Sequence, residues 1–276
     1  MLKGLNKIIL GLIILIVSQE TNAQTSKHSI ARSWNEGLLQ AIRLDLARPT
    51  VHSRNLFHHS LAMYEALAVL NDSCDNIFLG KTFGHKTTAF SGFTPSDPDT
   101  TALKITINYL SHRLLEYRFN SGNRTELIKQ HIDSIFIANG GDFNIVSVDY
   151  STGSAEALGN YIAQEIILFG QADGSNELNN FANTFYTPAN PPVAPALFGN
   201  SRIIDPNRWQ QIELNTQIDQ SGNPIPGNTQ PFLGPEWGNV TPFALKATDK
   251  ITKTRDGESF TLYSNLESPP LLDSNN

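Results

Sequence analysis

Apolar residues recur every three or four positions in several stretches of the chain after residue 28. In the stretch 99–120, for example, Leu103, Ile107, Leu110 and Leu114 share one side of a helix with 3.6 residues per turn. The same pattern predicts five helices, at about residues 29–46, 49–70, 99–120, 125–139 and 154–169. We therefore expect an all-α fold, in which a bundle of about five helices spans residues 24–170.

Helix boundaries follow from the residues that flank these stretches. We expect Ser29 to cap the first helix, and Pro49 suits the first turn of the second because its missing N–H is not needed there. Residues 61–70 are apolar nearly all round, which predicts a place in the middle of the bundle. Gly140 and Gly141 are expected to stop the fourth helix, and Gly170 to follow the end of the fifth.

Residues 171–276 differ in character and are called the extension below. Ten of the 15 prolines lie between Pro188 and Pro242, where they would interrupt the backbone hydrogen bonds of a helix. The same stretch holds two of the three tryptophans, Trp209 and Trp237, whereas disordered linkers are poor in large aromatic residues. We therefore expect a loop-rich but ordered segment that covers another part of the molecule.

The first 23 residues have the features of a secretory signal peptide. Lys3 and Lys7 precede an apolar run at 8–17, and Ala23 ends a stretch of small and polar residues. A run of ten residues is short for a membrane span. We expect cleavage after Ala23 and export to the periplasm or the medium; an uncleaved membrane anchor is the alternative. No later stretch is apolar and long enough to cross a membrane.

Charge and cysteine content exclude several classes of site. The net charge is −6, and loss of residues 1–23, with two lysines and one glutamate, would make it −7. An acidic chain does not favour non-specific nucleic-acid binding, which needs a basic surface. The single cysteine, Cys74, rules out an internal disulfide and any zinc or iron–sulfur site built on cysteines. Its acidic neighbours Asp72 and Asp75 disfavour a reactive thiolate.

The densest polar cluster lies at 48–59 and contains Arg48, His52, Arg54, His58 and His59. Two metal ligands on one helix must be three or four residues apart, and the positions that follow each histidine at this spacing hold no histidine or carboxylate. We favour a structural role, in which these groups cap the helix, pair with carboxylates and hydrogen-bond between helices. An anion site made of the two arginines and a histidine at the helix N-terminus is the alternative.

The remaining polar motifs are too incomplete to indicate a site. The segment 173–177, with Asp173 and Glu177, lacks EF-hand spacing and is expected to form a turn. Gly153-Ser154 precedes a helix, but no Gly-Lys-Ser/Thr follows. Ser60, Ser151 and Ser154 have no nucleophile-elbow context. No catalytic, cofactor-binding or metal-binding residue is therefore assigned.

Several strings of residues are specific as a set: segments 31–36, 41–58, 64–66, 173–177, 185–188, 207–210 and 232–238. Together they cover about residues 29–243 and resemble the opening part of exported bacterial vanadium-dependent haloperoxidases, which belong to the phosphatidic acid phosphatase type 2 superfamily. The resemblance implies an all-helical bundle. In complete members it also implies a bound vanadate, which supports peroxide-dependent oxidation of halide.

The family holds its vanadate through three motifs, and none of them occurs here. The first motif has a lysine seven residues before Arg-Pro, but Ala41 stands seven residues before Arg48-Pro49. The second is Pro-Ser-Gly-His, and each Ser-Gly pair here is followed by phenylalanine or asparagine. The third is an arginine followed, some residues later, by a histidine. After Ser53-Arg54 and Ser201-Arg202, the positions where this histidine would stand hold Ser60 and Arg208. No residue can therefore be carried over as a catalytic residue or vanadate ligand.

The resemblance thus implies the N-terminal helical portion of a longer haloperoxidase-like protein, inactive alone and without vanadate. Its expected partner is a missing C-terminal catalytic domain, on which the extension 171–276 would pack, or a second copy of the chain. Two alternatives stay open. The complete protein could be an acid phosphatase with the same oxyanion pocket, or the chain could be a non-catalytic helical binding or scaffold module.

Overall fold

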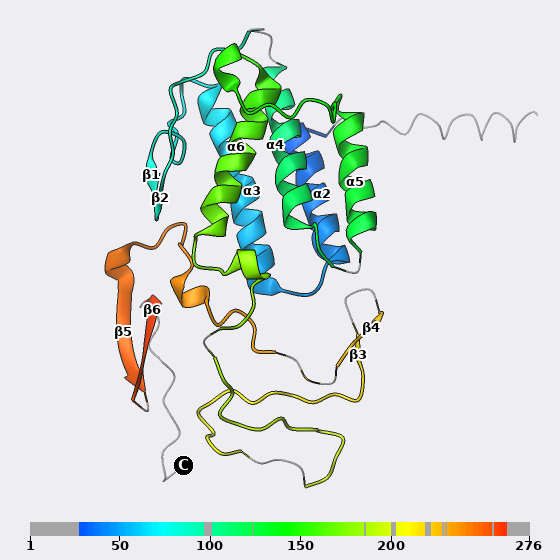
Figure 1. Cartoon of the computed structure of the whole chain (residues 1–276), viewed down its shortest axis with the longest axis vertical. Coiled ribbons are helices and arrows are strands. Elements are labelled where there is room, and N and C mark those ends of the chain that lie inside the picture. The colour runs from blue at the N-terminus through cyan, green and yellow to red at the C-terminus, as the bar shows by residue number, and fades with distance from the viewer. Residues whose placement is uncertain are drawn as a thin grey trace, which may run out of the picture.

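In the computed structural model, residues 28–96, 101–122, 124–184, 186–199, 203–218, 222–227, 229, 231–255 and 257–263 are described. The predicted signal peptide, 1–23, lies outside them. The described part contains five α-helices in an upright bundle (Figure 1), which confirms the predicted all-α class: α2 Ile30–Leu44, α3 Pro49–Val69, α4 Ala102–Arg118, α5 Thr125–Ala138 and α6 Ala155–Gln171. None of the helices in these residues is both long and apolar enough to cross a membrane.

Side-chain hydrogen bonds cap two of the helix starts, and the expected proline begins a third helix. Ser29 Oγ accepts a hydrogen bond from the Arg32 amide at 3.3 Å, and Ser154 Oγ accepts one from the Ala157 amide at 3.1 Å. Pro49 is the first residue of α3, as predicted. These contacts satisfy N–H groups that have no partner within the helix.

The predicted end of the fifth helix is wrong, because α6 continues through Gly170 to Gln171. The glycine has another purpose. A Cβ atom at residue 170 would lie 2.5 Å from Nη2 of both Arg54 and Arg118. The absent side chain therefore makes room for two guanidinium groups against the last turn of α6.

Helix α4, rather than the second half of α3, occupies the middle of the bundle. It packs against α2, α3, α5 and α6, whereas Tyr64 of α3 is exposed. Its closest approach is to α6, where a Cβ on Gly159 would lie 2.6 Å from the Thr106 carbonyl oxygen. The apolar run at 61–70 correctly indicated burial, but periodicity alone does not tell which buried helix is central.

A buried polar chain ties three helices together. Trp34 Nε1 of α2 donates to Asn108 Oδ1 of α4 at 3.0 Å, and Asn108 Nδ2 donates to the Phe136 carbonyl of α5 at 3.1 Å. Trp34 and Asn108 are almost fully buried. Satisfied polar groups inside an apolar core fix the register of the helices, since any slip would leave these groups without partners.

The connection between α3 and α4 is anchored by a buried carboxylate. Glu65 of α3 has no exposed surface. Its oxygens accept hydrogen bonds from the amides of Ile77, Phe78 and Leu79 at 2.9–3.0 Å and from Asn76 Nδ2 at 2.8 Å. This arrangement holds Phe78 and Leu79 in the core although they lie outside any helix.

Below the bundle, the described part of the extension is mostly loop (Figure 1), as predicted. Short antiparallel pairs occur along the chain: β1 Thr82–Phe83 with β2 Lys86–Thr87, β3 Gln217–Ile218 with β4 Pro224–Ile225, and β5 Lys250–Arg255 with β6 Glu258–Tyr263. The β5–β6 hairpin has six residues in each strand and was not expected from the sequence. The class remains all-α, with this hairpin added.

The predicted order of the extension is supported by its own aromatic contacts. The rings of Tyr186 and Phe232 stack at 4.1 Å, and the Trp209 ring meets Phe232 at 5.2 Å. Asn190 is buried and accepts from the amides of Ile204 and Asp205 at 2.8 Å. The tryptophan thus packs within the extension itself.

Candidate functional site

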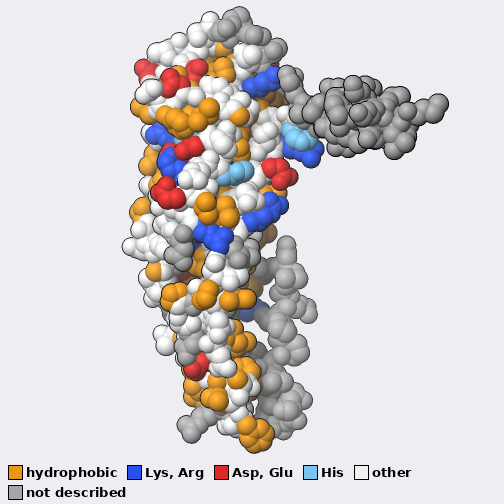
Figure 2. Space-filling view, turned by 90° about the vertical axis from the view of Figure 1, so that its right-hand side faces the viewer, with side chains coloured by type: hydrophobic (Ala, Val, Ile, Leu, Met, Phe, Trp, Pro, Cys, Tyr) orange, Lys and Arg blue, Asp and Glu red, His pale blue; other side chains and the backbone are white. Residues whose placement is uncertain are grey.

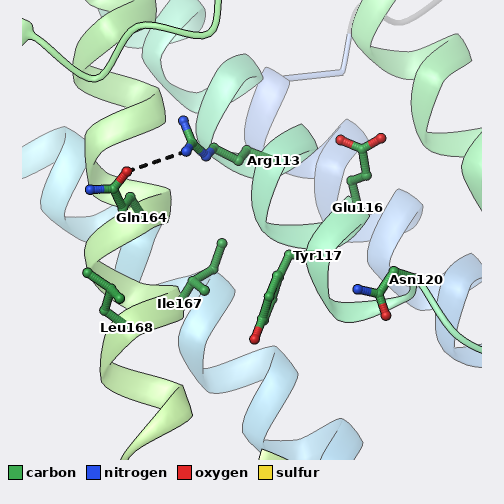
Figure 3. Close-up of a pocket in the computed structure, with 7 residues that line it drawn as sticks. All are labelled: Arg113, Glu116, Tyr117, Asn120, Gln164, Ile167 and Leu168. Carbon is green, nitrogen blue, oxygen red and sulfur yellow. Dashed lines mark hydrogen bonds between the residues drawn. The ribbon is translucent and has the colours of Figure 1, made fainter. Parts of the chain in front are cut away.

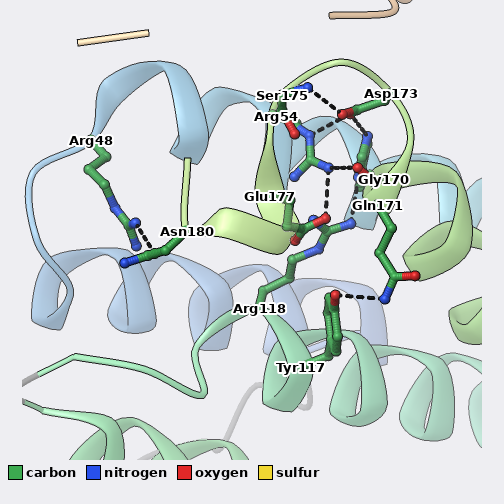
Figure 4. Close-up of polar contacts among 11 residues, drawn as sticks. Arg48, Arg54, Tyr117, Arg118, Gly170, Gln171, Asp173, Ser175, Glu177 and Asn180 are labelled. Atoms are coloured by element: carbon green, nitrogen blue, oxygen red, sulfur yellow. Dashed lines mark hydrogen bonds and ion pairs between the residues drawn. The ribbon is translucent and has the colours of Figure 1, made fainter. Parts of the chain in front are cut away.

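Five ionisable side chains meet at the base of the bundle and are called the charge network below. Figure 4 labels four of them: Arg54, Arg118, Asp173 and Glu177. Arg54 and the fifth, His58, come from α3, and Arg118 comes from the last turn of α4. Asp173 and Glu177 come from the segment directly after α6. The network therefore joins two helices, α3 and α4, to the start of the extension.

Arg54 is the centre of the network. Its Nε donates to Asp173 Oδ2 at 2.5 Å, and its Nη2 donates to the Gly170 carbonyl at 2.8 Å and to Glu177 Oε2 at 2.9 Å. Arg118 Nη1 pairs with the other oxygen of Glu177. All four charged side chains are less than a tenth exposed. Charges buried this deeply are stable only because each has partners of opposite sign.

His58 is held in the neutral form between these groups. Its pKa is lowered well below 6.5 by burial, and the charges of Arg118 and Arg54 lower it further. Arg118 Nη2 donates to His58 Nδ1 at 2.9 Å, so Nδ1 is the acceptor and the proton is on Nε2. Nε2 lies 3.7 Å from Asp173 Oδ2, which is too long for a hydrogen bond.

The other residues of the 48–59 cluster have structural partners, as the favoured interpretation predicts. Arg48 pairs with Asp45 at 3.1 Å, and His52 Nε2 lies 2.9 Å from the Leu46 carbonyl. His59 Nε2 meets Ser111 Oγ at 2.9 Å, and burial lowers the His59 pKa to about 4. These contacts hold α3 against its neighbours.

The geometry does not support the alternative of an anion site at this cluster. Within the described residues of the network, the charges of Arg54 and Arg118 are matched by those of Asp173 and Glu177, and His58 is neutral. Burial lowers the Arg118 pKa to about 10; the charge of Arg54 also lowers it, and Glu177 raises it. Arg118 is therefore still charged at neutral pH. An incoming anion would meet two carboxylates along with the two guanidinium groups.

The predicted turn at 173–177 is confirmed, but its acidic residues do more than turn the chain. The Ser175 amide donates to Asp173 Oδ1 at 3.0 Å, which forms the turn. The other oxygen, Oδ2, belongs to the charge network. In the described part of the chain, no three His, Cys, Asp or Glu side chains are placed to hold a metal ion. Cys74 is only partly buried.

Arg118 is the member of the network that sequence reasoning missed. In the sequence, Arg118 stands out only because it is a charged residue one helical turn after Leu114 and Leu115, which are buried on the same helix. A basic residue in the last turn of a helix is commonly explained by the helix dipole. Burial of its guanidinium against α6 depends on Gly170, which is 52 positions later in the chain.

Two hollows lie on α4 next to this network. One, of about 400 Å³, lies between α4 and α6 (Figure 3), and Arg113 Nη2 meets Gln164 Oε1 across it at 3.4 Å. The other, of about 320 Å³, lies beside Arg48, Arg118 and Phe181. Among the described residues that line them, neither hollow contains a histidine or cysteine.

Comparison with known proteins gives a match at the level of structure. No protein-family model matches the chain, and no curated protein sequence matches it. The apo form of a bacterial vanadium-dependent chloroperoxidase matches over 66% of this chain and 37% of its own, with 18% identity and a TM-score of 0.43. The holo form matches over 79% of this chain and 41% of its own, with 16% identity and the same TM-score.

The chain spans about two fifths of the length of these proteins. Similarity at this level of identity concerns the fold, and says nothing of the activity of this chain.

Proposed function

We propose that this chain is the N-terminal helical portion of an exported, vanadium-dependent haloperoxidase-like protein, and that it does not hold vanadate by itself. The sequence resemblance over residues 29–243 supports the family. The observation that carries the second part is the charge network. Its two buried guanidinium groups are already paired with two buried carboxylates.

Vanadate is a multiply charged oxyanion, and a protein binds such an ion through several unpaired cations and N–H donors. At the base of this bundle, Glu177 accepts from both arginines. A vanadate ion that approached them would have to displace Glu177 or share the buried space with its negative charge. Repulsion between like charges is strong where water is excluded, so the network is suited to hold the fold together.

We further propose that the extension docks a catalytic domain that carries the vanadate pocket. Its exposed large apolar residues support this assignment: Leu178, Leu197, Phe198, Ile203, Ile204, Ile212, Leu214, Ile218 and Leu233. Charged side chains gather over the helices, while the lower part of the face in Figure 2 is largely apolar or uncharged. Many exposed large apolar side chains on one part of a protein are typical of an interface.

The vanadate part of the proposal is tested by titrating the chain with vanadate, monitored by ⁵¹V NMR, and by assaying bromination with bromide and hydrogen peroxide. We expect no line broadening beyond that caused by an unrelated protein, and no bromination above buffer. A haloperoxidase with all three motifs serves as the positive control. Bromination by this chain alone would overturn the proposal, and hydrolysis of p-nitrophenyl phosphate by a longer version would favour an acid phosphatase.

The docking part is tested by hydrogen exchange on the chain and on a longer version that includes the three catalytic motifs. We expect amides in 203–218 to become protected in the longer version, whereas amides in α5, which packs against α2 and α4, stay unchanged. Sedimentation velocity tests the competing occupant. A dimer of the chain alone, with protection confined to the extension, would show that a second copy covers this surface.

A further inference from the structure

A hollow of about 460 Å³ lies where the β1–β2 turn meets the β5–β6 hairpin. Its walls include Phe83 and His85 from the first turn, and Lys250 and Tyr263 from the hairpin. Phe243 and Lys246, from the segment that leads into the hairpin, complete it. This volume is within the range of small-molecule sites.

The lining of this hollow is cationic. Lys246 and Lys250 are both exposed lysines at its edge, and His85 is an exposed histidine. Among the described residues that line it there is no carboxylate. The nearby Asp249 directs Oδ2 to the backbone amide of Lys246, at 2.7 Å. The charged side chains among these lining residues are therefore the two lysines.

The hairpin register places a cation next to an aromatic face. Lys250, the first residue of β5, is the cross-strand partner of Tyr263, the last residue of β6. Lys250 Nζ lies 5.3 Å from the centroid of the Tyr263 ring. Together with Phe83 and Phe243, this ring gives the hollow three aromatic side chains. Flat aromatic groups pack well against such walls.

The wall made by the β1–β2 turn and Thr241 is held in place by contacts with the bundle. The Thr241 amide donates to the Asp173 carbonyl at 2.9 Å, and Thr241 Oγ1 lies 3.2 Å from His85 Nδ1. The His85 ring stacks on Phe169 of α6 at 4.9 Å. A Cβ on Gly84 would lie only 2.3 Å from Thr241 Cγ2, so the turn and the segment are in direct contact. This wall is thus fixed before any ligand arrives.

We propose that this hollow binds an aromatic anion of the aryl carboxylate class. The ring would lie among Phe83, Phe243 and Tyr263, and the carboxylate would face the ammonium groups of Lys246 and Lys250. A neutral aromatic compound would lose the ionic contacts, and an aliphatic carboxylate would lose the ring contacts. The site therefore requires both features in one molecule.

The probe for this proposal is 2-naphthoate, titrated against the intact chain by saturation-transfer NMR. From the binding energy per atom typical of small ligands, we expect a Kd of about 1 mM or tighter. K246Q/K250Q is expected to weaken binding by roughly five- to tenfold, the effect of two exposed ionic contacts. K81Q/K104Q removes the same charge from exposed lysines outside the hollow and should leave the Kd unchanged.

Neutral 2-naphthalenemethanol and aliphatic octanoate are the matched ligand controls, and each should bind at least fivefold more weakly than 2-naphthoate. Because the substituted lysines are exposed, all variants should keep the wild-type melting curve. The proposal is overturned if 2-naphthoate fails to bind. It is equally overturned if K246Q/K250Q binds as tightly as K81Q/K104Q, since the ligand would then rest on other apolar surface of the extension.

Discussion

Substitution of Asp173 by asparagine isolates the contribution of one buried charge. The side chains of Arg54 and Asp173 are 3% and 0% exposed. Asp173 accepts at both oxygens, from Arg54 Nε and from the Ser175 amide. Asparagine keeps the size of the side chain but replaces one acceptor by an NH₂ group. Either the arginine or the turn amide would then face another donor.

The size of the effect follows from the burial of the partner. Removal of one member of a buried ion pair typically costs about 3–5 kcal/mol, because the other charge is left without compensation. Here Glu177 still faces Arg54 at 2.9 Å. We therefore expect D173N to lower the free energy of unfolding by about 3 kcal/mol, at the lower end of that range.

Urea unfolding followed by circular dichroism at 222 nm measures this cost. The matched control is K129Q, which breaks ion pairs at a lysine that is 43% exposed and should cost less than about 1 kcal/mol. The slope of the free energy against urea should be the same in all variants. Equal midpoints for D173N and K129Q would refute the reasoning, as would strictly additive costs in the double variant R54M/D173N.

Three further predictions concern other buried groups. G170A should lower the free energy of unfolding by about 2 kcal/mol, although alanine has the better helix propensity, because its Cβ would collide with two guanidinium groups. The control is G37A, whose Cβ would meet only the side-chain end of Ile135. Thermal melts compare the two variants. In E65Q, an NH₂ group would replace one carboxylate oxygen and would face backbone amides that now donate to Glu65. We therefore expect faster hydrogen exchange at residues 77–79, with exchange in α5 unchanged. Burial lowers the pKa of His59 to about 4 in the folded protein, from 6.5 in the unfolded chain. As the pH falls, the unfolded chain therefore takes up this proton first. The free energy of unfolding should be highest above pH 6.5 and should fall by about 3 kcal/mol towards pH 4. Urea titrations from pH 7 to 4.5 should show a shallower loss in H59N; an identical slope would exclude His59 as a cause.

The sequence was informative about the helices because their burial is local and periodic. All five predicted helices occur, and most of their ends agree within a few residues. The end of α6 was wrong because glycine has two uses that look alike in a sequence. It can end a helix, or it can let another group approach, and Gly170 does the second.

The hairpin β5–β6 was missed although its sequence carries a signal. Ile251, Thr252 and Thr254 are residues that favour strands, and Asp256-Gly257 is a frequent two-residue hairpin turn. Its neighbourhood of prolines and turn residues favoured the interpretation as loop. Gly257 has a φ of 84°, which such a turn needs.

The charge network shows the limit of sequence reasoning about the site. A structural role for the 48–59 cluster was predicted, because it lacks metal-ligand spacing. Its partners were not, since Arg54 and Asp173 are 119 positions apart and only the packing of α3 against the end of α6 brings them together. The predicted pairing with carboxylates was therefore right in kind, while the carboxylates involved could not be named.

The position of Asp173 links the stability of the bundle to the geometry of the proposed ligand site. Its carboxylate binds Arg54 and the turn amide, while its carbonyl accepts from the amide of Thr241, which lies at the wall of the hollow. A loss of the ion pair that also moves the backbone at residue 173 would shift Thr241 away from His85. The buried charges at the base of the bundle would then do more than stabilise it, because they would also set the spacing between the bundle and the hairpin on which the cationic hollow depends.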